Sequence, residues 1–309
     1  MATPRPGRGF PRKPGLVPRA LSTCAAFASW SFDMPPRLPW IGFLLRLFSL
    51  AKREPALLLP FDWVKDHVPI RGWRYLGLQE VEVEKIAGSV DRYDDFDRAF
   101  LPLRGEDERQ KRIEEALARG EVLPPVKLYK IGEVYFVVDG HHRVSAAKKA
   151  GAKFIDAEVV ELLSDVPLSP KDTEKDILLK AEYASFLRHT KLKELRPEAE
   201  IILSEISGYR KLLEHIDVHR YFRGLEEKRE IPYEEAVASW YDRVYRPIVE
   251  AIRRTGILKK FPGRTEADLY VWLSEHLYYL AKEKGIAPDL EKTAREFAQK
   301  YGAKLRSSV

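Results

Sequence analysis

Hydrophobic and polar positions between residues 80 and 160 change their period several times, which indicates a small mixed unit. Glu80–Ile86 alternates charged and apolar residues, as a half-buried strand does. In Asp107–Arg119, Ile113, Ala116 and Leu117 form one apolar stripe on a charged segment, which is typical of a surface helix. The predicted order is a strand at Glu80–Ile86, a helix at Asp107–Arg119, a strand from Val126, a turn at Lys130–Glu133, a strand at Val134–Val138, a helix at Arg143–Lys149 and a strand at Phe154–Val160.

From Lys171 onward the pattern is mainly helical. Thr265 to Asp268 resembles a capping box with Asp in place of the usual Glu or Gln. We therefore predict an α+β protein in which a small mixed-sheet domain precedes a mainly α-helical domain. The predicted helices are Thr173–Leu187, Glu198–His215, Tyr233–Thr255, Leu269–Lys284 and Leu290–Tyr301.

The N-terminal region fits neither pattern. Residues 1–33 are rich in Pro, Arg, Ser and Ala and contribute four of the six net positive charges, so we expect a disordered basic extension, or a translation start at Met34. Residues 34–78 read as a helical or irregular segment, and the further predicted domains are 79–163 and 171–309. Leu38–Leu50 is apolar but interrupted by Arg46 and too short to span a bilayer; it is expected to pack on the helical domain or a second subunit, or to lie on a membrane.

Composition indicates a soluble globular protein. The chain has 32% charged and 45% hydrophobic residues, and its single Cys24 rules out a disulfide framework within one chain. One cysteine is consistent with a reducing compartment, so a cytoplasmic location is expected. Outside residues 1–33 the chain is close to neutral, which weakens a nucleic-acid interpretation of the net charge.

The most informative segment is the box Asp139-Gly140-His141-His142-Arg143, which ends an apolar strand and opens a helix. Glycine lets the backbone approach a ligand closely, and the first N–H groups of a helix have no internal partner. Cationic side chains at a helix N-terminus are unfavourable unless an anion binds there. A plain turn before a solvated helix remains the alternative, but the strand-to-helix position favours an anion site.

With its flanking strands and helices, this box resembles the ParB/sulfiredoxin superfamily domain over about residues 79–163. Sulfiredoxins carry a catalytic cysteine where this chain has His141, so the resemblance excludes their chemistry. The box is most similar to that of free-serine kinases, which phosphorylate serine with a nucleotide, while ParB proteins bind CTP and carry a helix-turn-helix. The helical region resembles an uncharacterised domain attached to some bacterial ParB-like domains.

The resemblance implies a nucleotide-phosphate site built from the box and from the segment after the first strand. The expected phosphate-binding residues are Ser89, Arg92, Asp139, Gly140, His141, His142, Arg143 and Ser145. Asp91, Asp95 and His142 are candidates for catalysis, since a carboxylate can act as a general base or hold Mg²⁺ beside phosphates. Asp94 and Asp97 belong to the same acidic set, and a solvated or helix-capping role is the alternative for all four aspartates.

Two functions therefore remain open. In the first, the protein binds ATP or ADP, with Mg²⁺, and transfers a phosphoryl group to a small hydroxyl substrate, as a free-serine kinase does. In the second, it binds a nucleotide, CTP included, as a ParB-like switch that hydrolyses or only senses it, and the helical domain contacts DNA or a protein. No glycine-turned pair of helices with a basic second helix is evident, so DNA binding is not favoured. A homodimer is compatible with both.

Two further sequence features have plain structural explanations. His215 and His219 are four residues apart on one expected helix face, which suits a metal, but no third ligand stands out and we predict no metal site. Trp240–Pro247 mixes aromatic and basic residues, which suits base stacking or, more simply, a helix with an aromatic face in the core.

Overall fold

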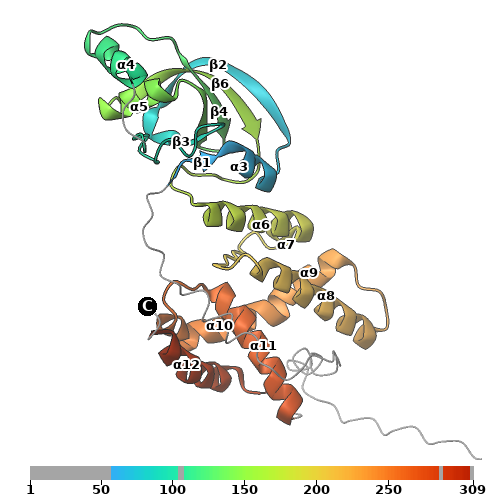
Figure 1. The fold of residues 1–309 in the computed structure, drawn as a ribbon. Helices are drawn as coiled ribbons and strands as arrows, with labels where there is room; N and C mark the ends of the chain where they lie inside the picture. The colour runs from blue at the N-terminus through green and yellow to red at the C-terminus, as the bar shows by residue number, and fades with distance from the viewer. Residues whose placement is uncertain (1–56, 104–107, 285–287, 307–309) are drawn as a thin grey trace, which may run out of the picture.

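The computed structural model describes residues 57–103, 108–284 and 288–306. The predictions for residues 1–33 and for Leu38–Leu50 lie outside these residues. Figure 1 shows a sheet at one end of the molecule, a group of helices at the other, and helix α6 (Glu174–Thr190) between them. The α+β organisation is thus confirmed.

The sheet has six strands in the order β1-β3-β5-β4-β6-β2. Their bounds are β1 Leu59–Pro60, β2 Gly72–Glu82, β3 Ile86–Ser89, β4 Val126–Ile131, β5 Val134–Asp139 and β6 Phe154–Leu163. Strands β4 and β5 form the predicted antiparallel hairpin, whereas β3 pairs with β5 and β4 pairs with β6 in parallel. The sheet is therefore mixed.

Alternation along β5 shows how one strand serves both faces of the sheet. Tyr135 and Val137 join a core that includes Val144 of helix α5 (His141–Lys149), on the side of α5 and α4 (Glu108–Ala118). Val134 and Phe136 join a core on the opposite face. That face is covered by α3 (Phe61–His67) and by Ile177 of α6.

The helical region has its own apolar core, which extends from Phe186 of α6 to Ala298. Thr173 caps α6 through a capping box with Asp176, and Thr265 and Asp268 make the predicted reciprocal hydrogen bonds at the start of α11. The remaining elements are α7 Leu192–Leu195, α8 Gly208–Glu227, α9 Tyr233–Trp240, a π-helical segment Tyr241–Tyr245, α10 Arg246–Thr255, a 3₁₀ turn Ile257–Lys260, α11 Glu266–Lys284 and α12 Leu290–Arg306.

Two predicted elements are wrong in their bounds. Glu80–Ile86 is not one strand, because a 3₁₀ turn at Val83–Lys85 separates β2 from β3. The helix predicted at Glu198–His215 begins at Gly208 and continues to Glu227, since Ile201 and Leu203 enter the core from chain without regular secondary structure. The sheet also takes in β1 and the start of β2, which lie before the predicted domain boundary at residue 79.

Within the described residues, no helix is long and apolar enough to cross a membrane.

Candidate functional site

The box lies at the carboxyl end of β5, where α5 begins. Gly140 is the N-cap residue, with φ 101° and ψ 25°, and it provides no side-chain hydrogen bond to the helix end. A Cβ at this position would lie 2.6 Å from Val126 Cγ1, so both the dihedral angle and the space require glycine. The helix therefore starts with uncapped N–H groups.

Ser89 and Arg92 reach the same place because β3 runs parallel to β5 and ends at Ser89. Ser89 Oγ lies 2.8 Å from His141 Nε2 and accepts a hydrogen bond of 2.9 Å from the backbone N–H of Arg92. Ser89 is fully buried and His141 is 7% exposed. The parallel register thus brings the two predicted segments, fifty residues apart, into direct contact.

A second chain of hydrogen bonds starts at Arg92 and passes through His142. Arg92 Nη1 lies 2.9 Å from His142 Nε2, and an arginine can only donate, so His142 Nε2 accepts and the ring proton lies on Nδ1. His142 Nδ1 then donates to Gln110 Oε1 at 2.9 Å. Gln110 Nε2 donates to Ser145 Oγ at 3.1 Å, and Ser145 Oγ to the carbonyl of Phe100 at 2.7 Å. We call Ser89, Arg92, His141, His142 and Gln110 the α5 cluster.

The ring of Phe96 contacts three members of this cluster. The ring stacks on His141 at a centroid distance of 6.2 Å and meets His142 edge-on at 5.9 Å. The Arg92 guanidinium carbon lies 5.2 Å from the same ring centroid. One aromatic side chain therefore fixes three polar groups in position.

Burial controls the charge of His141. Burial, together with the positive charge of Arg92 and the neighbouring His142, lowers the pKa of the imidazole to about 4. At neutral pH this ring is uncharged, so it serves as a hydrogen-bonding group. The permanent positive charge of the cluster belongs to Arg92, whose side chain is 37% exposed.

Other predicted site residues lie in different surroundings. Arg143 donates to the carbonyls of Pro124 and Pro125, at 2.6 and 2.8 Å, and to Asp139 Oδ2 at 2.6 Å. Its guanidinium therefore ties α5 to the chain before β4. Ser145 is 2% exposed and its hydroxyl is engaged within the core.

The aspartates of the segment after β3 differ in their hydrogen-bond partners and exposure. Asp95 Oδ2 accepts from Arg92 Nε at 2.7 Å, so Asp95 orients the arginine. Asp97 Oδ1 accepts from the N–H of Leu101 and caps a turn. Asp91 is exposed and close enough to influence the titration of His141. Among described residues, no three His, Cys, Asp or Glu side chains gather as a metal site.

Sequence reasoning missed Gln110 and Phe96. Gln110 is a polar residue in the first turn of a highly charged helix, and nothing in its spacing distinguishes it from a solvated side chain. Phe96 lies within an acidic segment, and an apolar residue among aspartates is the one signal that could have indicated burial.

The two histidines of α8 have separate hydrogen-bond partners. His215 Nδ1 lies 3.1 Å from Tyr270 Oη, and His219 Nε2 lies 2.9 Å from Ser239 Oγ. The aromatic segment also has a structural role, because Trp240, Tyr241 and Tyr245 are buried in the helical core. These contacts explain both features without a ligand.

These observations define an α+β protein with a polar cluster at the uncapped N-terminus of a helix. No family model matches the chain, and no curated protein matches it. Among solved structures, the C2221 form of a pNOB8-like ParB N-domain is 15% identical, with 74% of this chain and 99% of that chain covered and a TM-score of 0.21. A second pNOB8-like ParB N-domain structure is 16% identical, with 78% and 94% covered and a TM-score of 0.22.

Both structures are ParB N-domains, one branch of the superfamily that residues 79–163 resemble, and neither bears on the similarity of the box to free-serine kinases. The strand order β1-β3-β5-β4-β6-β2 of the chain itself defines its fold.

Proposed function

We propose that this protein binds the phosphate groups of a nucleotide at the N-terminus of α5 and transfers a phosphoryl group to a small hydroxyl substrate. One observation carries the proposal: an uncapped helix begins at a left-handed glycine, and Arg92 lies beside it, hydrogen-bonded to His142 of the first turn. Helix N–H groups and a guanidinium fork are the donors that phosphate oxygens require.

Each residue of the cluster has a distinct part in this proposal. Arg92 would contact the phosphates, held in place by Asp95 and Phe96. His142, whose two ring nitrogens bind Arg92 and Gln110, would hold the arginine in position, and Ser89 would fix the ring of His141 beside the helix end. Arg143, Asp139 and Ser145 would support α5 rather than touch the ligand, because their polar groups already bind the chain.

Phosphoryl transfer also needs a group that accepts the hydroxyl proton. Asp91 suits this role best, since it is exposed and near His141, whereas Asp95 is engaged by Arg92. Mg²⁺ bound to a nucleotide takes only one or two carboxylates from a protein, so the exposed Asp91 also fits a metal that arrives with the nucleotide. Bound Mg²⁺ would neutralise phosphate charge.

Calorimetry with ATP, ADP and CTP tests the binding step. The wild-type chain is expected to bind at least one of them, and Arg92→Ala to weaken that binding at least tenfold. Arg109→Ala, a change of the same charge at an exposed position of α4, should leave it unchanged. Equal affinity of wild type and Arg92→Ala would overturn the proposed site.

A product assay tests the transfer step. The chain with the bound nucleotide and a panel of hydroxyl metabolites, serine included, should yield a phosphorylated product, and Asp91→Asn should abolish it while nucleotide binding remains. If the nucleotide binds but no phosphorylated product forms, phosphoryl transfer is excluded and the nucleotide-switch function is favoured.

A further inference from the structure

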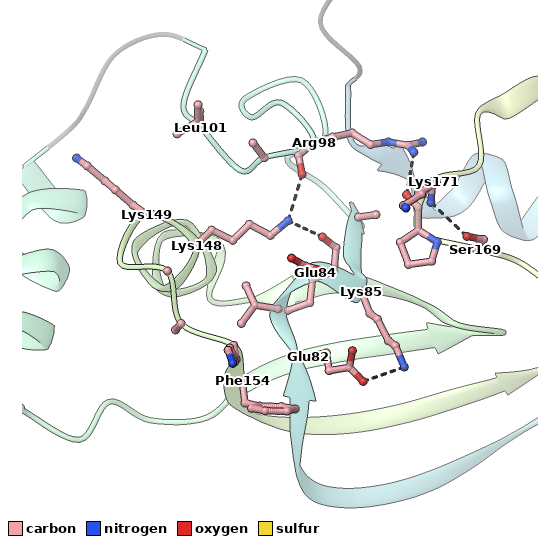
Figure 2. A pocket seen from close by; sticks show the side chains of 18 residues that line it. Glu82, Glu84, Lys85, Arg98, Leu101, Lys148, Lys149, Phe154, Ser169 and Lys171 are labelled. Atoms are coloured by element: carbon pink, nitrogen blue, oxygen red, sulfur yellow. Dashed lines mark hydrogen bonds and ion pairs between the residues drawn. The ribbon is translucent and has the colours of Figure 1, made fainter.

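A large cavity lies at the other end of α5 from the α5 cluster. Its volume is about 1180 Å³, and it is walled by the turn between β2 and β3, residues 98–101, the carboxyl end of α5 and residues 169–171 (Figure 2). A nine-residue helix is roughly 13 Å long, so the cavity and the cluster are separate places.

The described lining of this cavity is strongly basic. Six of its side chains are cationic and two are carboxylates. Lys85 pairs with Glu82, and Lys149 pairs with Glu114 outside the lining. Glu84 is then the one remaining carboxylate of the described lining, beside four further cations. The six cations are Lys85, Arg98, Lys148, Lys149, Lys153 and Lys171.

The two most enclosed cations are held by carbonyl groups. Lys148 Nζ donates to the carbonyls of Ile86 and Arg98, at 2.8 and 3.1 Å, and lies 4.6 Å from the Phe100 ring centroid. Arg98 donates to the carbonyls of Leu57, Pro170 and Asp172, at 3.2, 3.0 and 2.6 Å. Carbonyls orient a cation but do not neutralise it.

Their titration agrees with this geometry. Burial lowers the pKa of Lys148 to about 8 and lowers the pKa of Arg98 as well. Both groups therefore carry positive charge in a place that disfavours it, and an anion in the cavity would favour the charged forms. The last carbonyls of α5 already accept from the N–H groups of residues 150–152, so the helix end offers few acceptors to the cavity.

We infer that this cavity binds a small, multiply charged oxyanion, a phosphate compound or a polycarboxylate, between Lys148, Arg98 and the exposed Lys171. An excess of cations over carboxylates in the lining, with two of the cations held in place by carbonyl groups, is the feature of such a site. Lys148 bonds the carbonyls of Ile86 and Arg98, which flank the segment that bears Ser89 and Arg92. An anion bound to Lys148 would therefore be linked to the α5 cluster through this segment.

Calorimetry with pyrophosphate and with citrate, at low salt, tests this inference. The full chain carrying Arg92→Ala is used, so that the α5 cluster does not contribute. At least one probe should bind, and adding Lys171→Glu should weaken that binding at least tenfold. Adding Lys111→Glu instead, an equal charge change at an exposed position of α4 that is not part of the lining, should leave it within twofold.

Lys148→Met is expected to abolish binding of the same probe, with the fold checked by circular dichroism. Should that variant unfold, the rate at which an amine-reactive ester labels Lys148 in the Arg92→Ala chain provides the second readout, and the probe should slow it at least fivefold. Binding of pyrophosphate but not citrate would identify the ligand as a phosphate compound. Binding of citrate but not pyrophosphate would identify it as a polycarboxylate. Binding of neither probe, or equal binding with Lys171→Glu and Lys111→Glu, would overturn the inference.

Discussion

At the scale of single residues, neighbours in sequence have different tasks. The side chains of His141 and His142 belong to the α5 cluster, whereas Arg143, the next residue, donates to the carbonyls of Pro124 and Pro125. Successive helical residues point about 100° apart, so one box cannot present all its side chains to one ligand. The sequence predicts which residue types gather here, but the direction of each side chain depends on the register of β3 and β5.

Arg143→Ala should therefore reduce stability more than binding. The change removes a guanidinium that holds two carbonyls and Asp139, and we expect the free energy of unfolding to fall by about 2 kcal/mol. Urea unfolding measures this loss, and calorimetry should give a nucleotide affinity within threefold of wild type. A tenfold loss of affinity in a fully stable variant would show that Arg143 is itself a phosphate ligand.

Gly140→Ala combines an unfavourable dihedral angle with a close contact to Val126 Cγ1. We expect it to cost about 3 kcal/mol of unfolding free energy. Gly120→Ala is the matched control, because Gly120 also has positive φ, 73°, but no atom within 4 Å of the added Cβ, so about 1 kcal/mol is expected. Equal losses in thermal or urea unfolding would show that steric contact at Gly140 contributes nothing.

At the scale of elements, hydrophobic periodicity predicts the helices and strands whose residues follow a regular local pattern. The hairpin at β4 and β5, helices α4, α5 and α6, and the capping box before α11 were all visible in the sequence. The 3₁₀ turn at Val83–Lys85 was not, since alternation continues through it. The start of α8 was not visible either, because Ile201 and Leu203 lie in the segment predicted as a helix but are buried from chain without regular secondary structure.

Helix α6 provides the test at this scale, because it packs on both the sheet and the helical core. Thr173→Ala removes the side chain that accepts from the N–H of Asp176, and should lower the unfolding free energy by about 1 kcal/mol. Ser207→Ala is the control: Ser207 is the N-cap residue of α8 but makes no side-chain capping bond, so its removal should cost under about 0.5 kcal/mol. Equal losses from the two variants in urea unfolding would contradict this account of the caps.

At the scale of the whole molecule, three histidines with strongly lowered pKa values link stability to pH. Burial lowers the pKa values of His141, His215 and His219 to about 4. The unfolded chain has the ordinary value of about 6.5, so it binds protons first as the pH falls. Stability is therefore full above pH 6.5 and declines between pH 6.5 and 4.

His219→Asn isolates one of these contributions. The variant is expected to be less stable than wild type at pH 7.5. This difference in unfolding free energy should shrink by roughly 3 kcal/mol at pH 4, because protonation of His219 in the unfolded chain destabilises only the wild type. Urea unfolding at the two pH values measures the difference. A deficit that is constant with pH would contradict a depressed pKa at His219.

The central claim is that phosphates bind at the N-terminus of α5, and histidine NMR tests it most directly. The chain labelled with ¹⁵N at histidine should show shifts of the His141 and His142 backbone signals on addition of ATP, ADP or CTP, with His215 and His219 of α8 as internal controls that do not move. In Arg92→Ala, the same additions should leave all four unchanged at equal concentration. No movement of His141 and His142 with any of the three nucleotides would contradict the account.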